Sequence, residues 1–279
     1  MWEDREIDKV VKGFLRQLLG INKKSTVSGM RAETGKFPLS INVYVQIIKY
    51  WVRMLTSESS LIQGAHMDNI ERFTEGKQCW IRPVVYLLKT CGMDQIDIKE
   101  ICGKEGAFIK QIRDKLTELY KEQWKKEVEK EDGKLRFYYE LKKTFQFEVY
   151  LDKIPRADRK HTTRLRLSCH SLPIETLRYL NKDKTVRICP ICKSKEVGDE
   201  WHYLTRCKNN EINDTRCHFV EKITSLQPQL KNFELKTLMK YCLTMHDTLI
   251  QTEVAYFVKN LLSMYAAAKD EEEGTCSLM

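Results

Sequence analysis

The stretch RICPICKSKEVGDEWHYLTRC, residues 187–207, carries the most specific pattern in this chain of 279 residues. Its cysteines and its histidine follow the spacing C-x2-C, nine residues, H, four residues, C, at positions Cys189, Cys192, His202 and Cys207. Three thiolates and one imidazole make the tetrahedral ligand set of structural Zn²⁺ sites, in which no position stays open for water. The pattern therefore predicts one Zn²⁺ cofactor in a structural, non-catalytic site.

The residues between these ligands favour a small CCHC zinc knuckle. A gap of two residues lets both sulfur atoms of a tight turn face one ion, and Pro190 stiffens that turn. Asp199 is suited to cap a short helix that begins at Glu200. Such a helix places His202 in its first turn and Cys207 just beyond its end.

The same cysteines allow other interpretations: a redox dithiol, a disulfide, or a chance spacing among ten cysteines. A redox C-x-x-C is expected to follow a strand, whereas here a polar, basic run precedes the pair. Cys217 and His218 remain alternative ligands, because spacing does not exclude an exchange. The other cysteines are expected to be small apolar core residues: Cys79, Cys91, Cys102, Cys169 and Cys242.

The composition predicts a packed protein with an anionic partner. A hydrophobic fraction of 42% supports a core, and a net charge of +9 favours negatively charged ligands. Because 39 acidic residues oppose 48 basic ones, the positive surplus must be regional. Residues 1–8 are of mixed charge, so no secretion signal is expected, and free thiols then fit a reducing compartment, nuclear or cytoplasmic.

Hydrophobic periodicity predicts a mainly α fold. Apolar residues recur at helical spacing, and the expected helices span residues 10–19, 39–55, 61–73, 83–90, 106–130, 135–145 and 156–171, with a loop over 21–37. The helix over 39–55 is the most apolar, but it is shorter than a bilayer span and has a polar face, so no stable membrane association is expected. We expect a helical region over 1–153, a basic helix with the zinc-binding module over 154–220, and C-terminal helices with an acidic, disordered tail over 221–279.

The helix expected after Pro155 concentrates the positive charge. Arg156, Arg159, Thr163, Arg166 and His170 share one helical face, which predicts contacts with the phosphates of a nucleic acid. The alternative is a basic face that only meets solvent. The predicted nucleic-acid-binding residues, which continue to the first cysteine of the motif, are Arg156, Arg159, Lys160, Arg164, Arg166, His170, Arg178, Lys184 and Arg187.

The run RLRLSCHSLPIETLRYLNKDKTVRICPICKSKEVGDEWHYLTRC, residues 164–207, resembles the C-terminal zinc-binding region of reverse-transcriptase polyproteins from LINE-type non-LTR retrotransposons. The likeness covers about residues 10–220 and is most specific near the cysteines. It implies a region that follows the polymerase and contacts element RNA or target DNA. The residues that match the family pattern are Leu172, Ile174, Glu175, Arg178, Tyr179, Cys189, Cys192, Glu200, His202, Leu204 and Cys207.

The chain departs from that family in its catalytic residues. Family polymerases carry paired catalytic aspartates, and this sequence contains no Asp-Asp pair. After the motif, Asp214 is isolated, Glu211 lies in a polar segment, and Lys208 stands where the family often has proline. The sequence therefore predicts a retrotransposon-derived fragment that is not an enzyme and binds RNA or DNA. The alternative is a helical protein-interaction scaffold with a purely structural zinc site.

The C-terminus, Cys276-Ser277-Leu278-Met279, has the C-a-a-X form of a prenylation signal. The acidic residues 270–273 precede it where a polybasic second signal is expected, and a single lipid chain gives only marginal membrane binding. Lipidation of Cys276 and a chance ending on an acidic tail are the two interpretations.

Overall fold

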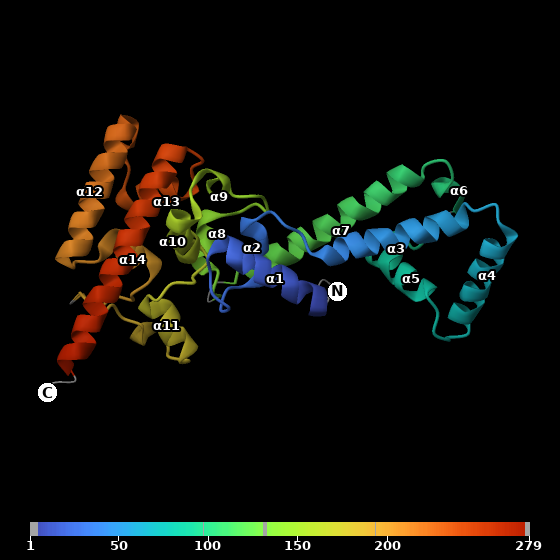
Figure 1. Ribbon diagram of the computed structural model, residues 1–279, viewed down its shortest axis with the longest axis horizontal. Coiled ribbons are helices and arrows are strands. Elements are labelled where there is room, and N and C mark those ends of the chain that lie inside the picture. The colour runs from blue at the N-terminus through green and yellow to red at the C-terminus, as the bar shows by residue number, and fades with distance from the viewer. Residues whose placement is uncertain (1–4, 97, 131–132, 193, 277–279) are drawn as a thin grey trace. The chain divides into compact units, whose positions relative to one another are not determined.

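A computed structural model describes residues 5–96, 98–130, 133–192 and 194–276 (Figure 1). The chain is mainly α-helical, as its periodicity predicts. Within the described ranges, β pairing is limited to isolated bridges between Thr34 and Phe147 and between Ile188 and Val197. No helix in the described part of the chain is long and apolar enough to cross a bilayer.

The chain divides into two compact units, and the division falls inside α1 (Arg5–Leu19) and α7 (Glu105–Val128). Unit 1 comprises residues 1–10 and 37–124 and holds most of α7 with α3 (Leu39–Leu55), α4 (Ser60–Thr74), α5 (Ile81–Thr90) and α6 (Ile98–Ile101). Unit 2 comprises residues 11–36 and 125–279. Its further elements are α2 (Val27–Glu33), α8 (Arg136–Leu141), α9 (Tyr150–Lys153), α10 (Arg156–Arg166), α11 (Pro173–Tyr179), η1 (Lys184–Val186), η2 (His202–Arg206), α12 (Asn210–Leu226), η3 (Pro228–Asn232), α13 (Leu235–Thr244) and α14 (Thr248–Cys276).

Unit 1 is built around α3, which packs against α4 and α5. Ile41, Val45, Ile48 and Val52 recur at helical spacing and are all buried, so one apolar face holds this helix in place. The helix has the predicted bounds, because its apolar run and its interior face coincide. Full burial of each such side chain stabilises the fold by about 1.5–3 kcal/mol.

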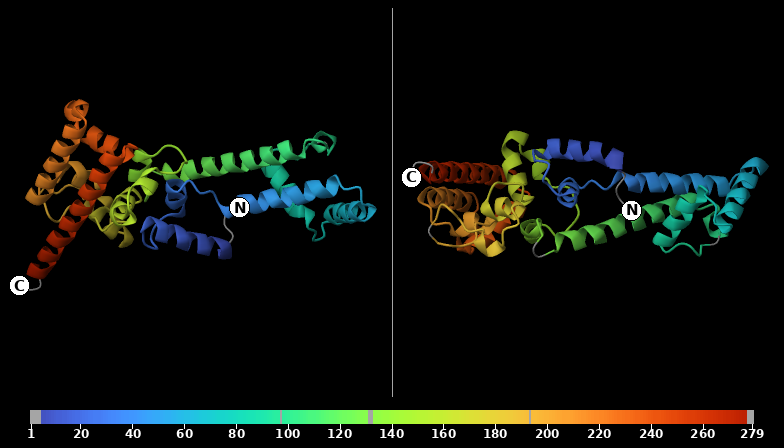
Figure 2. Two further views of the ribbon diagram at one scale, coloured as in Figure 1. Left: turned by 45° about the horizontal axis from the view of Figure 1, so that its top comes forward. Right: turned by 90° about the horizontal axis from the view of Figure 1, so that it is seen from below.

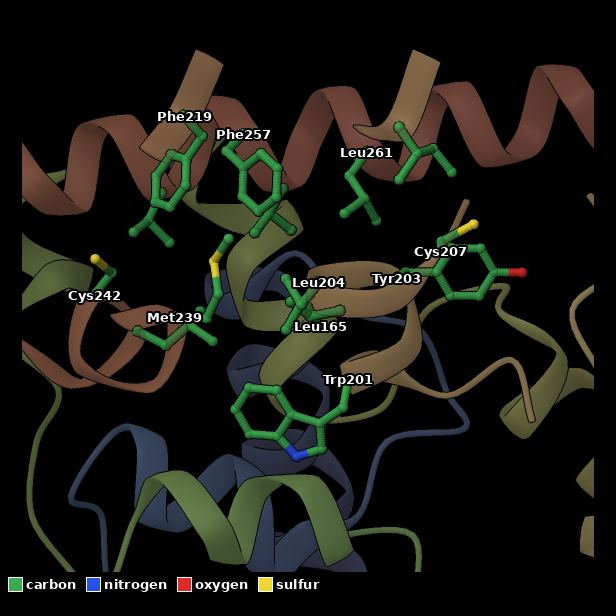
Figure 3. Packing of buried hydrophobic residues seen from close by; sticks show 14 of the residues in the cluster. Leu165, Trp201, Tyr203, Leu204, Cys207, Phe219, Met239, Cys242, Phe257 and Leu261 are labelled. Carbon is green, nitrogen blue, oxygen red and sulfur yellow. The ribbon is translucent and has the colours of Figure 1, made fainter. Parts of the chain in front are cut away.

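Unit 2 is built around α14, which packs along α10, α12 and α13 (Figures 1 and 2). The rings of Phe219 on α12 and Phe257 on α14 stack with centroids 4.4 Å apart. Figure 3 shows the two rings side by side. Leu165 of α10 and Leu204 of η2 belong to the same buried cluster. This core therefore joins residues from both sides of the Cys/His motif.

The compact units do not follow the ranges 1–153, 154–220 and 221–279. Residues 125–153 pack with unit 2, since Phe137 of α8 lies in the same cluster as Leu165 and Ile250. The long helix α14 contributes its apolar face to this core and thereby joins the predicted second and third regions.

Several predicted elements differ from the structure. The helix expected over 135–145 ends at Leu141, and the tail expected to be disordered is helical as far as Cys276. The segment 21–37 contains α2, whose first turn is capped by the Thr26 side chain accepting a hydrogen bond from the Gly29 N–H. The basic helix ends at Arg166 instead of residue 171, because Ser168 adopts a left-handed φ of 50° and turns the chain toward α11. The prediction of an unbroken helix over 156–171 is therefore wrong in its last turn.

Candidate functional site

All the predicted metal ligands come together in unit 2. The ligand atoms of Cys189, Cys192, His202 and Cys207 lie within 4.8 Å of one another, and the four side chains are buried. This cluster can hold a metal ion. The ligands come from two short local structures, a cysteine turn and the π-helical element η2.

The cysteine turn is closed by backbone pairing on both sides. The Cys189 N–H donates to the Glu196 carbonyl at 2.8 Å, and the Gly198 N–H donates to the Arg187 carbonyl at 2.8 Å. A Cβ atom at Gly198 would lie 2.9 Å from Cγ of Pro173, so the close approach of this turn to α11 requires glycine. This backbone pairing brings the segment after Cys192 back alongside Cys189, next to the Cys/His cluster.

The second pair of ligands is placed by a capped, widened helical turn. The Asp199 carboxylate accepts a hydrogen bond from the His202 N–H at 2.7 Å, which is the predicted cap. The Cys207 N–H donates to the His202 carbonyl at 2.7 Å, five residues back, so the turn is π-helical. Nδ1 of His202 lies 3.2 Å from Glu196, and Nε2 lies 3.3 Å from the sulfur of Cys192. The imidazole therefore turns one nitrogen to the thiols and the other to a carboxylate.

The cluster stabilises negative charge on sulfur. Hydrogen bonding from Cys207, with further donation from His202 and Tyr203, lowers the pKa of Cys189 to about 3 despite its burial. Donation to Cys189 and burial raise the pKa of Cys207. Burial opposes the charged form of His202, but hydrogen bonds to Cys189 and Glu196 outweigh it and raise its pKa to about 9. Thiolate character is what a metal ion needs from cysteine ligands.

The Cys/His cluster is part of the core of unit 2. The hydroxyl of Tyr203 donates to the sulfur of Cys189 at 3.1 Å, and its ring meets that of Tyr265 on α14 edge-on at 5.1 Å. Arg216 of α12 donates to the carbonyl of Cys207 at 3.0 Å. Figure 3 shows Tyr203 and Cys207 among the side chains of the buried cluster. Helices α12 and α14 therefore support the ligand-bearing turn directly.

Glu200 connects the ligand-bearing turn to the end of α10. Its buried carboxylate accepts hydrogen bonds from Ser168 at 3.0 Å and Arg136 at 2.7 Å, and lies 2.9 Å from Nε2 of His170. Burial alone would raise the pKa of Glu200, but the contact with His170 and the charge of Arg136 outweigh it and lower the pKa to about 2. The sequence gives no hint of this network beyond the match of Glu200 to the family pattern.

Three of the predicted cationic residues share one accessible face of α10. Arg156, Lys160 and Arg164 follow one another at i, i+4 and i+8 and are exposed or half-buried. With Arg16 of α1 they line a cavity of about 660 Å³. Among the described residues that line this cavity there is no aspartate or glutamate. The positive charges that line the cavity are therefore not balanced by carboxylates in its described lining.

Two of the predicted phosphate contacts lie in the interior instead. Arg166 is 1% exposed and pairs with Glu33 at 2.7 Å and Glu148 at 3.0 Å. The side chain of His170 is fully buried against Glu200. The face through Arg166 and His170 turns inward because α10 packs against α8, α9 and α14 and ends before His170. These two residues therefore do not belong to the accessible basic surface.

The remaining predicted cations have protein partners or meet solvent. Arg159 donates to the Ile154 carbonyl at 2.9 Å, and Arg178 pairs with Glu175 at 2.9 Å. Arg178, Lys184 and Arg187 line a second cavity of about 410 Å³, which also contains Asp183. Arg187 is held there by the Lys182 carbonyl at 2.7 Å. This cavity is basic, but its charge is partly compensated.

The other cysteines divide by burial. Cys91, Cys169 and Cys242 are buried, as expected for apolar core residues, whereas Cys79 is half-buried and Cys102 is exposed. Cys217 and His218 are exposed on α12, and the ligand group contains neither of them. The side chain of Cys276 and residues 277–279 lie outside the described part of the structure.

Comparison with known proteins found no match, whether to a family model, to a curated protein or to a solved structure. The function has to be argued from the geometry of unit 2 and from the residues that carry the retrotransposon resemblance.

Proposed function

We propose that this chain is a non-catalytic nucleic-acid-binding protein whose Cys/His cluster holds one structural Zn²⁺. The ligand chemistry supports zinc, because three thiolates and one imidazole complete a tetrahedral shell. Burial of all four ligands supports a structural site, since no side of the cluster is left for a substrate. The ion would be held by Cys189, Cys192, His202 and Cys207.

In this proposal the metal positions the basic helix. A bound ion fixes η2 and the preceding Glu200, and Glu200 holds Ser168 and His170 directly after α10. The C-terminal end of α10 is therefore tied to the metal cluster through one carboxylate. Zinc binding and presentation of the cationic face are expected to be lost together.

The observation that carries the nucleic-acid assignment is the cavity lined by Arg16, Arg156, Lys160 and Arg164, with no carboxylate among its described lining residues. Cations gathered in one concavity have a strong affinity for a chain of phosphates, and they release condensed counterions on binding. The resemblance to LINE-type polyproteins adds the expectation that the partner is element RNA or target DNA. Contacts of this kind position a backbone and do not read bases.

A mobility-shift titration tests the proposal. The zinc-loaded chain is titrated with single-stranded and double-stranded RNA and DNA at two salt concentrations. The logarithm of the binding constant should fall by about 0.7–0.9 per phosphate contact for each tenfold rise in salt. Absence of binding to every one of these ligands at low salt would contradict the proposal.

A second candidate function is a protein-interaction scaffold in which zinc only holds helices together. It is favoured by exposed apolar side chains on α4 of unit 1, where Leu61 is 81% exposed and Met67 is 62% exposed. An apolar interface responds little to salt, so a salt-insensitive complex with a protein partner would support this second function.

A further inference from the structure

The cationic cavity beside α10 adjoins a second one. Asn22 and Arg164 line both cavities, and we call the two cavities together the α10 groove. The second part has a volume of about 510 Å³ and reaches Tyr179 at the end of α11. The groove also contains Lys24 and His161, and the described residues that line it include no aspartate or glutamate. Cationic side chains therefore line both parts of the groove.

One cation of the groove, Arg164, is held in place before any ligand binds. Arg164 donates from Nε to the Gly20 carbonyl at 2.9 Å. Gly20 has a φ of +67°, and a Cβ atom there would lie 2.8 Å from Cβ of Lys160, so the turn after α1 closes tightly onto α10. The Nε atom of Arg16 is buried without a hydrogen-bond partner in the described part of the chain. Such a donor is a feature that a bound anion would satisfy.

The local potential of the groove is positive. Burial lowers the pKa of His161, and the charges of Lys160 and Arg164 lower it further. His161 therefore has a reduced tendency to add a further positive charge to this part of the groove. The groove therefore combines sites for phosphates with a less charged stretch between them.

The geometry of α10 disfavours a duplex as the ligand. A helix that reads the major groove has to project from the protein, whereas α10 is packed against α8, α9 and α14 and leaves only one face open. Its cations line a concavity, while the phosphates of a duplex lie on the outside of a stiff cylinder. A single strand is flexible enough to lie in the groove.

Tyr179 supplies an aromatic surface at one end of the groove. Its side chain is 42% exposed, its hydroxyl accepts a hydrogen bond from Lys134 at 2.7 Å, and Nζ of Lys24 lies 4.1 Å from the ring centroid. Proteins that bind single strands combine such aromatic platforms with a basic groove. We propose that the α10 groove binds a single-stranded polynucleotide, with phosphates along Arg156, Lys160 and Arg164 and a base stacked on Tyr179. This inference rests on the nucleic-acid function proposed above.

The test uses fluorescence anisotropy to measure how tightly the full, zinc-loaded chain binds single-stranded and duplex probes. The probe is oligothymidine of about 16 nucleotides, the upper end of single-strand site sizes, alone or annealed to oligoadenosine. The single strand should bind more tightly than the duplex. Equal or tighter binding of the duplex overturns the inference and leaves the nucleic-acid function standing, whereas no binding of any probe, DNA or RNA, single-stranded or duplex, overturns both. Oligouridine of equal length shows whether the chain prefers RNA or DNA. Tighter binding of either single strand than of its duplex supports the proposal that the groove binds single strands.

Paired variants assign the binding to the groove. Arg156→Gln with Lys160→Gln should weaken single-strand binding roughly fivefold per lost contact at 0.1 M salt and reduce the salt slope by about 0.7 per contact. Lys231→Gln with Lys240→Gln removes the same charge from exposed positions of unit 2 outside the groove and is the matched control. Equal effects of the two pairs would overturn the assignment to the groove.

Variants of Tyr179 test the aromatic contact. Tyr179→Ala should weaken single-strand binding roughly tenfold through lost stacking, while Tyr179→Phe keeps the ring and should bind nearly as the parent does. Circular dichroism confirms that each variant is folded. Equal affinities of the alanine and phenylalanine variants for oligothymidine would overturn the stacked base.

Discussion

The two units are stabilised by different chemistry. Unit 1 buries an apolar helix face, with Ile48 of α3 and Leu87 of α5 fully enclosed. Unit 2 buries charged residues as well, including Arg166 with Glu33 and Arg136 with Glu200, and it holds the Cys/His cluster. Truncation in an apolar core costs the free energy of the buried atoms and of the cavity left behind, whereas removal of a charged partner leaves the other charge buried and unpaired. The stability of unit 2 should therefore depend on a few polar groups far more than that of unit 1.

Loss of the metal is expected to have the largest effect and to separate the two units. Elemental analysis should find about one Zn²⁺ per chain, and Cys192→Ser or a chelator should remove it. Because structural Zn²⁺ contributes up to roughly 10–16 kcal/mol in small domains, hydrogen exchange should rise around Cys189 and η2, and then in α10. Amides of α3 and α5 should stay protected.

Cys217→Ser is the control for the metal prediction. This exposed cysteine on α12 is close in sequence to the ligands but is not part of the cluster. It should keep both the zinc content and the exchange pattern of the parent. The metal prediction would be contradicted by a folded protein that contains no zinc, or by loss of protection from hydrogen exchange in both units at once.

Removal of the buried arginine should give the next largest effect. Arg166→Met leaves the carboxylates of Glu33 and Glu148 buried without this partner, which costs about 3–5 kcal/mol. The cost should be measured as the free energy of unfolding of unit 2, followed by hydrogen exchange in urea. Arg156→Met, on the exposed end of the same helix, should change it by less than about 0.5 kcal/mol. Similar costs for the two variants would disprove the buried position of Arg166.

These residues also show what the sequence could predict. The metal ligands lie within residues 189–207, so their approach depends only on turns and caps that neighbouring residues determine, such as Asp199 before His202. Arg166 looks like part of an exposed basic face because its spacing matches Arg156 and Arg159. Its partner Glu33 lies 133 residues away along the chain, and no local sequence pattern indicates such a pair. The accessible face, through Lys160 and Arg164, follows from the packing of α10 on α14.

The sequence pattern also fails to predict a helix whose formation depends on tertiary contacts. The short helix α2 has a threonine cap at Thr26, but glycine and charged residues dilute its apolar pattern. It forms because Met30 and Ala32 are fully buried in unit 2. In unit 1, by contrast, α3 has the predicted bounds, since its own apolar run is long enough to define it.

A core truncation in unit 1 should cost slightly less than removal of Arg166 and should be independent of metal. Ile48→Ala opens a cavity beneath α3 and should lower the free energy of unfolding of unit 1 by roughly 2–5 kcal/mol. Val43→Ala, at a half-exposed position of the same helix, is the control and should have little effect. Addition of a chelator should leave the difference between the two variants unchanged, and a metal-dependent difference would contradict the separate stabilisation of the units.

The smallest effect should come from the link between the metal cluster and α10. Ser168→Ala removes one hydrogen bond to the buried carboxylate of Glu200 but leaves those of Arg136 and His170, so the expected cost is about 1 kcal/mol. Ser171→Ala, at an exposed position of the same turn, should be nearly neutral. In the zinc-free protein η2 no longer holds Glu200 in place, and the difference between the two variants should disappear. A difference that persists without zinc would show that Glu200 is fixed by Arg136 and His170 alone, and that α10 is positioned independently of the metal.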